Sequence, residues 1–156
     1  MEKLNFNEIL NRKDLEYQIL DFLKNFNNNI NSKSKRAIYL YGENGSGKTQ
    51  FVKQILLDNN YDIVYYDNIQ QRNKNIIDNI SNNIISSHNI LSLLNSKPKN
   101  IVLVFDDIYS MNNNDKSSLT NLIKLIKKKP QKNNTTYYPI ICINNLIEEK
   151  KILDLM

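Results

Sequence analysis

Residues 38–49 constrain this chain more than any other stretch, because an apolar strand pattern leads there directly into a glycine-rich loop. They read Ile-Tyr-Leu-Tyr-Gly-Glu-Asn-Gly-Ser-Gly-Lys-Thr. The spacing Gly-x4-Gly-Lys-Thr is met at four positions: Gly42, Gly47, Lys48 and Thr49. An amphipathic helix pattern follows, and a strand before and a helix after this spacing are the context of a phosphate-binding P-loop. The sequence therefore predicts a loop that binds a polyphosphate.

The residue types in this pattern suit a phosphate and its metal ion. Glycine lets backbone N–H groups approach the ligand closely and take positive φ. Lys48 supplies a compact cation for the β- and γ-phosphates, and the hydroxyl of Thr49 is a hard oxygen ligand for Mg²⁺. The helix that starts here adds the positive end of its dipole. We expect ATP and Mg²⁺ to bind, with the nucleotide contacted by Gly42, Glu43, Asn44, Gly45, Ser46, Gly47, Lys48, Thr49 and Gln50.

Glycine is concentrated in this loop. The chain contains three glycines, and all of them lie here: Gly42, Gly45 and Gly47. Turns elsewhere are made without glycine, and the 28 asparagines can supply them because asparagine tolerates left-handed backbone. An ordinary turn is the alternative interpretation of the loop, and the flanking strand and helix disfavour it.

Length and composition indicate one domain without a disulfide framework. With 156 residues, the chain can bury a substantial core but is too short for two domains of ordinary size. Cys142 is its only cysteine, no apolar stretch approaches the ~20 residues of a membrane span, and the N-terminus lacks a secretory signal. We therefore expect a soluble intracellular protein without a membrane partner. The formal net charge of +5 permits a nucleic-acid partner.

Strand patterns and helix patterns alternate along the chain. Short apolar runs predict strands over 37–41, 62–66, 101–105 and 139–143. Apolar residues at helical spacing predict helices over 14–26, 48–57, 76–85, 115–129 and 147–155, with a weaker helical piece over 90–94. This alternation implies an α/β fold of three layers, a parallel sheet with helices on both faces. Residues 1–36 would form an N-terminal helix and polar linker, and 37–156 the core.

A second candidate site follows the strand pattern at 101–105, which ends abruptly in Asp106 and Asp107. An apolar strand that ends in two carboxylates downstream of a P-loop is typical of a Walker B element. Asp106 would hold Mg²⁺ through water opposite Thr49, and Asp107 would orient or deprotonate the attacking water. Asn145, at the end of the next strand, is in a position to hydrogen-bond the γ-phosphate or that water. A capped turn or an exposed acidic pair is the structural alternative for the two aspartates.

Together these motifs resemble those of AAA+ ATPases, and more narrowly those of the large subunit of the clamp loader replication factor C. The broader resemblance is carried by the P-loop, the Phe-Asp-Asp-Ile block at 105–108 and the Pro-Ile-Ile-Cys-Ile-Asn-Asn segment at 139–145. The narrower one is carried by residues 61–80, by 106–129 and by the Pro-Ile-Ile-Cys-Ile strand. The resemblance covers most of the chain from Ala37 onward.

The resemblance implies a role for each motif. Residues 42–49 match Walker A, Asp106 matches the Mg²⁺ aspartate, and Asn145 matches sensor 1. Asp107 stands where the family has glutamate. The implied catalytic residues are Lys48, Asp107 and Asn145, and the implied metal ligands are Thr49 and Asp106. The implied function is ATP-dependent opening and loading of a ring-shaped sliding clamp on primed DNA, at the site of DNA replication in the nucleus or cytoplasm. Other AAA+ subunits, the clamp and the DNA would be the partners.

The resemblance also implies an order for the strands of the sheet. The strand at Ile38 would lie next to that at Ile140, followed by those at Val102 and Ile63. The family's fifth strand would begin beyond Met156, so we expect the strand over 37–41 to be an exposed edge that invites pairing unless something covers it. The helix over 14–26 is a candidate cover.

Two departures from the family pattern bear on hydrolysis. The chain ends at Met156, where family members continue into an arginine finger and a helical lid that carries sensor 2, and no arginine follows Arg72. We therefore expect a core without the lid, whose ATP hydrolysis is weak or depends on partners. The alternatives are an initiator or helicase-loader ATPase, a nucleotide-binding scaffold that does not hydrolyse ATP, and a nucleotide kinase. Arginine scarcity argues against the kinase.

Overall fold

The structure, a computed structural model, describes residues 11–28, 35–67, 100–108, 116–127 and 138–145. Its helices are α2 (Lys13–Asn28), α3 (Lys48–Asp58) and α6 (Lys116–Lys127). Its strands are β1 (Ala37–Tyr41), β2 (Asp62–Tyr66), β3 (Ile101–Phe105) and β4 (Ile140–Asn144). These bounds agree with the predicted elements to within three residues at each end. The helical patterns at 76–85, 90–94 and 147–155 lie outside the described residues.

The strands form one parallel sheet in the order β1-β4-β3-β2. This is the order that the resemblance implied. The register pairs Tyr41 with Asn144, and Phe105 with Cys142. Parallel strands all have their carboxyl ends at the same end of a sheet. The loop after β1 and the aspartates after β3 therefore both lie at the carboxyl end of this sheet, with the end of β4 between them.

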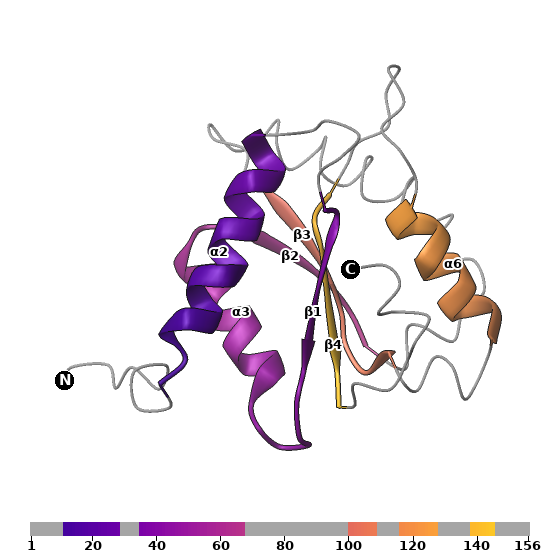
Figure 1. Ribbon diagram of the computed structural model, residues 1–156, viewed down its shortest axis with the longest axis horizontal. Helices are drawn as coiled ribbons and strands as arrows, with labels where there is room; N and C mark the ends of the chain where they lie inside the picture. Colours follow the sequence, from indigo (N-terminus) through magenta and orange to yellow (C-terminus); the bar gives the residue numbers. More distant parts are fainter. Residues whose placement is uncertain (1–10, 29–34, 68–99, 109–115, 128–137, 146–156) are drawn as a thin grey trace.

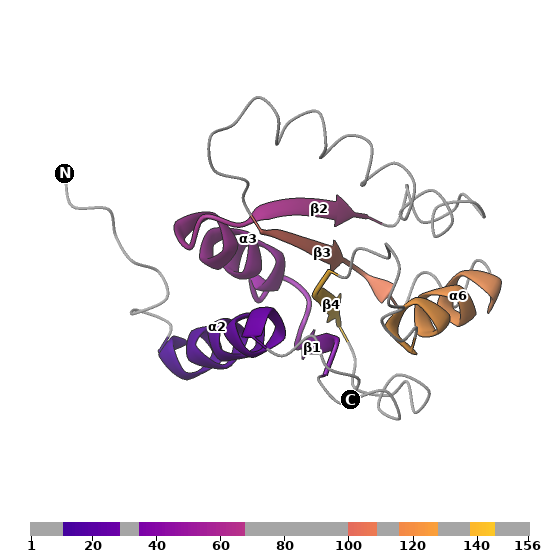
Figure 2. The same cartoon turned by 90° about the horizontal axis from the view of Figure 1, so that it is seen from above.

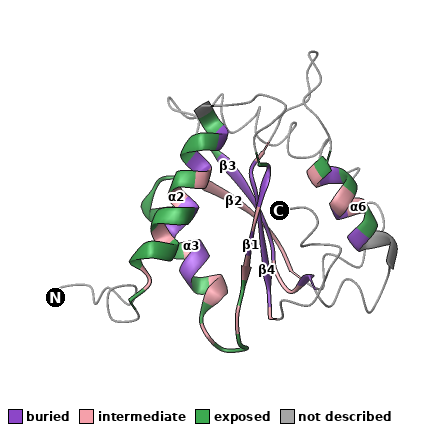
Figure 3. Cartoon of the chain, in the orientation of Figure 1, coloured by how far each residue is buried: buried purple, intermediate pink, exposed green. Residues whose placement is uncertain are grey.

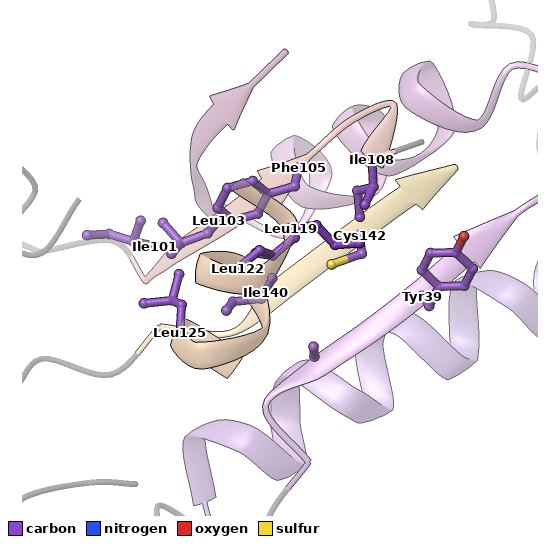
Figure 4. Packing of buried hydrophobic residues seen from close by; sticks show 11 residues of the cluster. Tyr39, Ile101, Leu103, Phe105, Ile108, Leu119, Leu122, Leu125, Ile140 and Cys142 are labelled. Carbon is purple, nitrogen blue, oxygen red and sulfur yellow. The ribbon is translucent and has the colours of Figure 1, made fainter. Parts of the chain in front are cut away.

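Helices cover both faces of the sheet, so the described part has the three predicted layers (Figures 1 and 2). β3 and β4 are buried at every position, as strands covered on both sides are. Alternate residues of the strands face opposite sides. On one face, Leu103, Phe105 and Ile140 pack against Leu119 and Leu122 of α6 (Figure 4).

The other face of the sheet packs against both α2 and α3. Ile19 and Leu23 of α2 share a buried cluster with Val52 of α3 and with Val104 and Ile141 of the strands. Figure 3 shows the buried residues of α2 on its sheet-facing side and the exposed ones outside. The N-terminal helix is therefore part of the core. It lies on a face of the sheet beside α3, at the end of the sheet where β1 lies (Figure 2).

Arg36, which we predicted in a polar linker, is buried and connects the α6 side of the domain to the sheet. Its Nη1 donates to the carbonyl oxygen of Leu125, and its Nε donates to that of Tyr138 at 3.5 Å. Leu125 lies in the last turn of α6, where carbonyl groups have no partner within the helix. The guanidinium therefore caps α6 and matches the negative end of its dipole.

Of the helices that the structure describes, none combines the length and the apolar character that crossing a membrane requires.

The docking of α2 gives a prediction about stability. Leu23 is fully buried, whereas Leu15 on the same helix is 41% exposed. Leu23→Ala should lower the free energy of unfolding by about 2–5 kcal/mol, the cost of a cavity in a packed core. Leu15→Ala, the matched control, should change it by less than ~0.5 kcal/mol. Urea denaturation followed by circular dichroism measures both. Equal stability of the two variants would contradict the docking of α2.

Candidate functional site

The glycine-rich loop after β1 takes left-handed backbone at two positions, Gly45 (φ 75°) and Gly47 (φ 79°). Gly47 is also the N-cap of α3, and no side-chain hydrogen bond caps this described helix start. The first turn of α3 contains no acidic residue. Its leading N–H groups and the positive end of its dipole are therefore available to an anion, as in phosphate sites at helix N-termini.

The ammonium group of Lys48 lies across this loop. Its Nζ donates to the carbonyl oxygens of Gly42 (2.9 Å) and Glu43 (2.8 Å), and lies 3.4 Å from the hydroxyl of Ser46. The loop's own polar groups thus orient the cation. Of the predicted nucleotide contacts, Gly42, Ser46, Lys48 and Thr49 are half-buried, and the others are exposed: Glu43, Asn44, Gly45, Gly47 and Gln50.

One hydrogen bond joins the loop to the predicted Walker B strand. The hydroxyl of Thr49 donates to Oδ2 of Asp106 at 2.6 Å, and the backbone N–H of Asp107 donates to Oδ1 of Asp106 at 2.9 Å. A hydroxyl and a carboxylate are the hard oxygen donors that suit Mg²⁺. Within the described ranges no group of three or more His, Cys, Asp or Glu side chains could hold a metal ion. A two-residue set fits Mg²⁺, which usually keeps several waters and binds substrate phosphates.

Tyr65 of β2 also reaches this carboxylate, and the sequence did not identify it as a site residue. Its hydroxyl donates to Oδ2 of Asp106 at 2.5 Å, and Nζ of Lys53 lies 3.7 Å from the centre of its ring. Burial, together with the hydrogen bond and the negative charge of Asp106, raises the pKa of Tyr65 well above its ordinary value. The hydroxyl therefore stays protonated and remains a donor. Tyr65 pairs with Val104, two residues before Asp106. The predicted strand order already placed these two strands side by side, so it could have identified Tyr65 as a neighbour of Asp106.

The two other predicted polar groups lie near the same edge of the sheet. Asp107 has φ of 53°, in the left-handed region. Asn145 is half-buried and directly follows β4, whose last residue, Asn144, pairs with Tyr41 at the end of β1. Asn144 itself is buried and donates to the hydroxyl of Tyr39 at 2.6 Å. That contact commits Asn144 to the core, and Asn145 is the asparagine closer to solvent.

Arg12, just before α2, contacts the loop from outside and was also missed. Its Nη2 donates to the carbonyl oxygen of Ser46 at 2.5 Å, and its guanidinium carbon lies 5.5 Å from the centre of the Phe51 ring. In a planar trans peptide the carbonyl and the next N–H point in opposite directions. Arg12 therefore holds the Ser46–Gly47 peptide so that the N–H of Gly47 points away from the Arg12 guanidinium. No motif marks a lone arginine 34 residues from its partner.

A parallel sheet whose carboxyl ends carry a glycine loop, a helix N-terminus and a carboxylate defines the P-loop class of nucleotide-binding proteins. Comparison with known families narrows this class. Residues 38–151 match the ATPase family associated with various cellular activities (AAA), and the chain belongs to that family.

Individual relatives agree with this assignment. The chain is similar to the replication factor C large subunit of Methanococcus maripaludis (strain C7), with 23% identity over 124 residues, 79% of this chain and 24% of that protein. The corresponding subunit of Methanococcus vannielii is 25% identical over 99 residues, 63% of this chain and 19% of that protein. The chain thus spans a quarter or less of these relatives. The structure of C. elegans PCH-2 shares the fold, with a TM-score of 0.55 and 16% identity over 91% of this chain and 40% of that one.

The contact of Arg12 predicts how firmly the loop is held. Arg12→Ala removes a charged donor worth ~1.5–3 kcal/mol, so amide hydrogen exchange in residues 43–51 should become at least ~10-fold faster. Lys24→Ala, which changes an exposed lysine on α2, is the control and should leave this exchange unchanged. Exchange followed by mass spectrometry measures both variants. An unchanged rate in Arg12→Ala would show that the contact does not stabilise the loop.

Proposed function

We propose that this chain is an ATP-binding AAA+ subunit of a clamp-loader-like DNA replication complex, with ATP hydrolysis that is weak or depends on partners. The observation that carries the proposal is the hydrogen bond from Thr49 to Asp106, 2.6 Å long, which joins the glycine loop to the end of β3. It brings a phosphate-binding element and a metal-holding carboxylate into one site.

Nucleotide binding follows from the groups around the loop. The N–H groups at the start of α3 and the ammonium of Lys48 would hold the phosphates, and Gly42 and Gly47 allow the backbone to approach them. Thr49 and Asp106 would hold Mg²⁺, the Asp106 carboxylate acting through water. When bound, Mg²⁺ would neutralise charge on the phosphate oxygens.

The proposed catalytic groups are Lys48, Asp107 and Asn145. Asp107 would orient the attacking water, Lys48 would stabilise charge on the transferred phosphoryl group, and Asn145 would hydrogen-bond the γ-phosphate or the water. An arginine from another subunit would complete the site by stabilising the charge of the transition state.

The assembly and its partners are inferred from the relatives. The two Methanococcus proteins are named as large subunits of replication factor C, and similarity to them supports a place beside other AAA+ subunits. We extend this to a sliding clamp and primed DNA as partners, in the nucleus or cytoplasm, and the net charge of +5 is compatible with DNA. Membership of the AAA family disfavours a stand-alone nucleotide kinase.

One observation favours a second candidate, a nucleotide-binding scaffold that does not hydrolyse ATP. Asp107 is one methylene shorter than the glutamate that the resemblance leads us to expect there, and its carboxylate should fall short of the water by about 1 Å, which can cost ~10²-fold in rate. Both candidates bind ATP at the same site, so binding and turnover are tested separately.

Calorimetric titration with ATP and Mg²⁺ tests binding. Lys48→Ala should weaken the affinity at least ~10-fold, because a hydrogen bond from a charged donor is worth ~1.5–3 kcal/mol. Lys124→Ala, an exposed lysine on α6 across the sheet, is the matched control and should bind as the unchanged chain does. Equal affinities for all three proteins would remove the loop from consideration as the nucleotide site.

Phosphate release by the isolated chain tests turnover. We expect a rate well below the ~1 s⁻¹ of complete phosphoryl-transfer enzymes, because an arginine finger is worth ~10³–10⁵ in rate. Asp107→Glu should raise this rate by up to ~10²-fold, since it restores the reach of the carboxylate. Asp107→Asn should reduce it to the level of Lys48→Ala, which serves as the background.

Two outcomes of that assay separate the candidates. Equal rates for the unchanged chain, Asp107→Asn and Lys48→Ala, with ATP still bound by the first two, favour the scaffold. Turnover at ~1 s⁻¹ or faster by the chain alone would contradict the proposal that other subunits complete the site.

A further inference from the structure

We propose that Tyr65 is a positioning residue for the metal-holding carboxylate of Asp106, through which it sets the Mg²⁺ dependence of nucleotide binding. The inference rests on the proposed function, because it assigns a further residue to the same site.

The contacts of Asp106 fix both of its carboxylate oxygens. Oδ2 accepts from the hydroxyls of Thr49 at 2.6 Å and Tyr65 at 2.5 Å, and Oδ1 accepts from the N–H of Asp107 at 2.9 Å. Thr49 is on α3, Tyr65 on β2, and Asp107 follows Asp106 itself. Donors from these three directions restrict rotation of the carboxylate about its terminal bond, which is otherwise a soft torsion.

The side chain of Tyr65 is itself held in a position from which it can orient the carboxylate of Asp106. Its backbone is fixed in β2, paired with Val104 of β3, and the ammonium of Lys53 lies 3.7 Å from the ring centre. Thr49 and Lys53 are four residues apart on α3, so they lie on one face of the helix. One helix face therefore presents Thr49 to the carboxylate and Lys53 to the ring that contacts it. The four side chains form a connected set: Lys53, Tyr65, Asp106 and Thr49.

A phenol suits this position because it orients the carboxylate without neutralising it. A cation bonded to Asp106 would compete with Mg²⁺ for its negative charge, whereas a neutral hydroxyl leaves that charge in place. The positive charge of Lys53 lies instead over the ring face, where aromatic rings attract cations. Groups that orient metal ligands in this way typically change metal affinity 10- to 100-fold when removed, by the general range for outer partners of metal sites.

Tyr65→Phe removes the hydroxyl and keeps the ring under Lys53. ATP affinity would be measured by calorimetry in EDTA and across a series of Mg²⁺ concentrations. We expect the Mg²⁺ concentration for the half-maximal change in affinity to rise ~10-fold, with affinity in EDTA unchanged within about twofold. The matched control is Tyr66→Phe, the neighbouring residue on the opposite face, whose ring stacks on Phe105 at 4.9 Å. Its Mg²⁺ dependence should equal that of the unchanged chain.

The controls separate positioning from a structural role. If Tyr65→Phe lowers the melting temperature but leaves the Mg²⁺ dependence unchanged, the hydroxyl only stabilises the fold and the inference is wrong. A shift of the same size in Tyr66→Phe would overturn it as well. Thr49→Val, which removes a predicted ligand, should shift the Mg²⁺ dependence at least as far as Tyr65→Phe.

The failure of the inference differs from the failure of the proposed function. If the wild-type chain binds ATP with a clear Mg²⁺ dependence and Tyr65→Phe shows the same dependence, only the role of Tyr65 is refuted. An unchanged chain that binds no ATP at any Mg²⁺ concentration refutes the proposed function and the inference together.

Discussion

The hydrogen bond between Thr49 and Asp106 is the contact on which the candidate site depends, because its two residues come from opposite sides of β4. Thr49 belongs to the helix that follows β1, Asp106 follows β3, and β4 lies between those strands in the sheet. The bond therefore requires that the glycine loop carry the start of α3 toward β3 at the carboxyl end of β4. Left-handed backbone at Gly45 and Gly47 makes such a loop possible without steric cost.

The packing on both faces of the sheet keeps the two ends of this bond in place. β3 and β4 are buried at every position, so a shift of either strand would disturb α6 on one side and α2 and α3 on the other. Two arginines reinforce this arrangement from opposite sides. Arg12 binds the outside of the loop, and Arg36 binds the last turn of α6. Both arginines in the described residues thus stabilise the loop and the helix packing that hold the site in place.

What the sequence predicted well was local, and what it missed depends on contacts between distant residues. The strands and the helices at 48–57 and 115–129 follow from periodicity within a few adjacent residues, and the loop follows from a spacing whose geometry is nearly fixed. Tyr65 reaches Asp106 only because β2 pairs with β3, and that order came from the family resemblance. The burial of Arg36 depends on α6 and on Tyr138, so its position among polar residues indicated a linker.

The backbone at Asp107 shows why the carboxylate there can be short. Its φ of 53° lies in the left-handed region, which aspartate and asparagine enter more readily than most residues because their short side chains bond locally. A glutamate would reach further but would fit this backbone less well. Reach and backbone conformation therefore oppose each other at this position. The left-handed turn after β3 therefore favours the shorter acid at position 107.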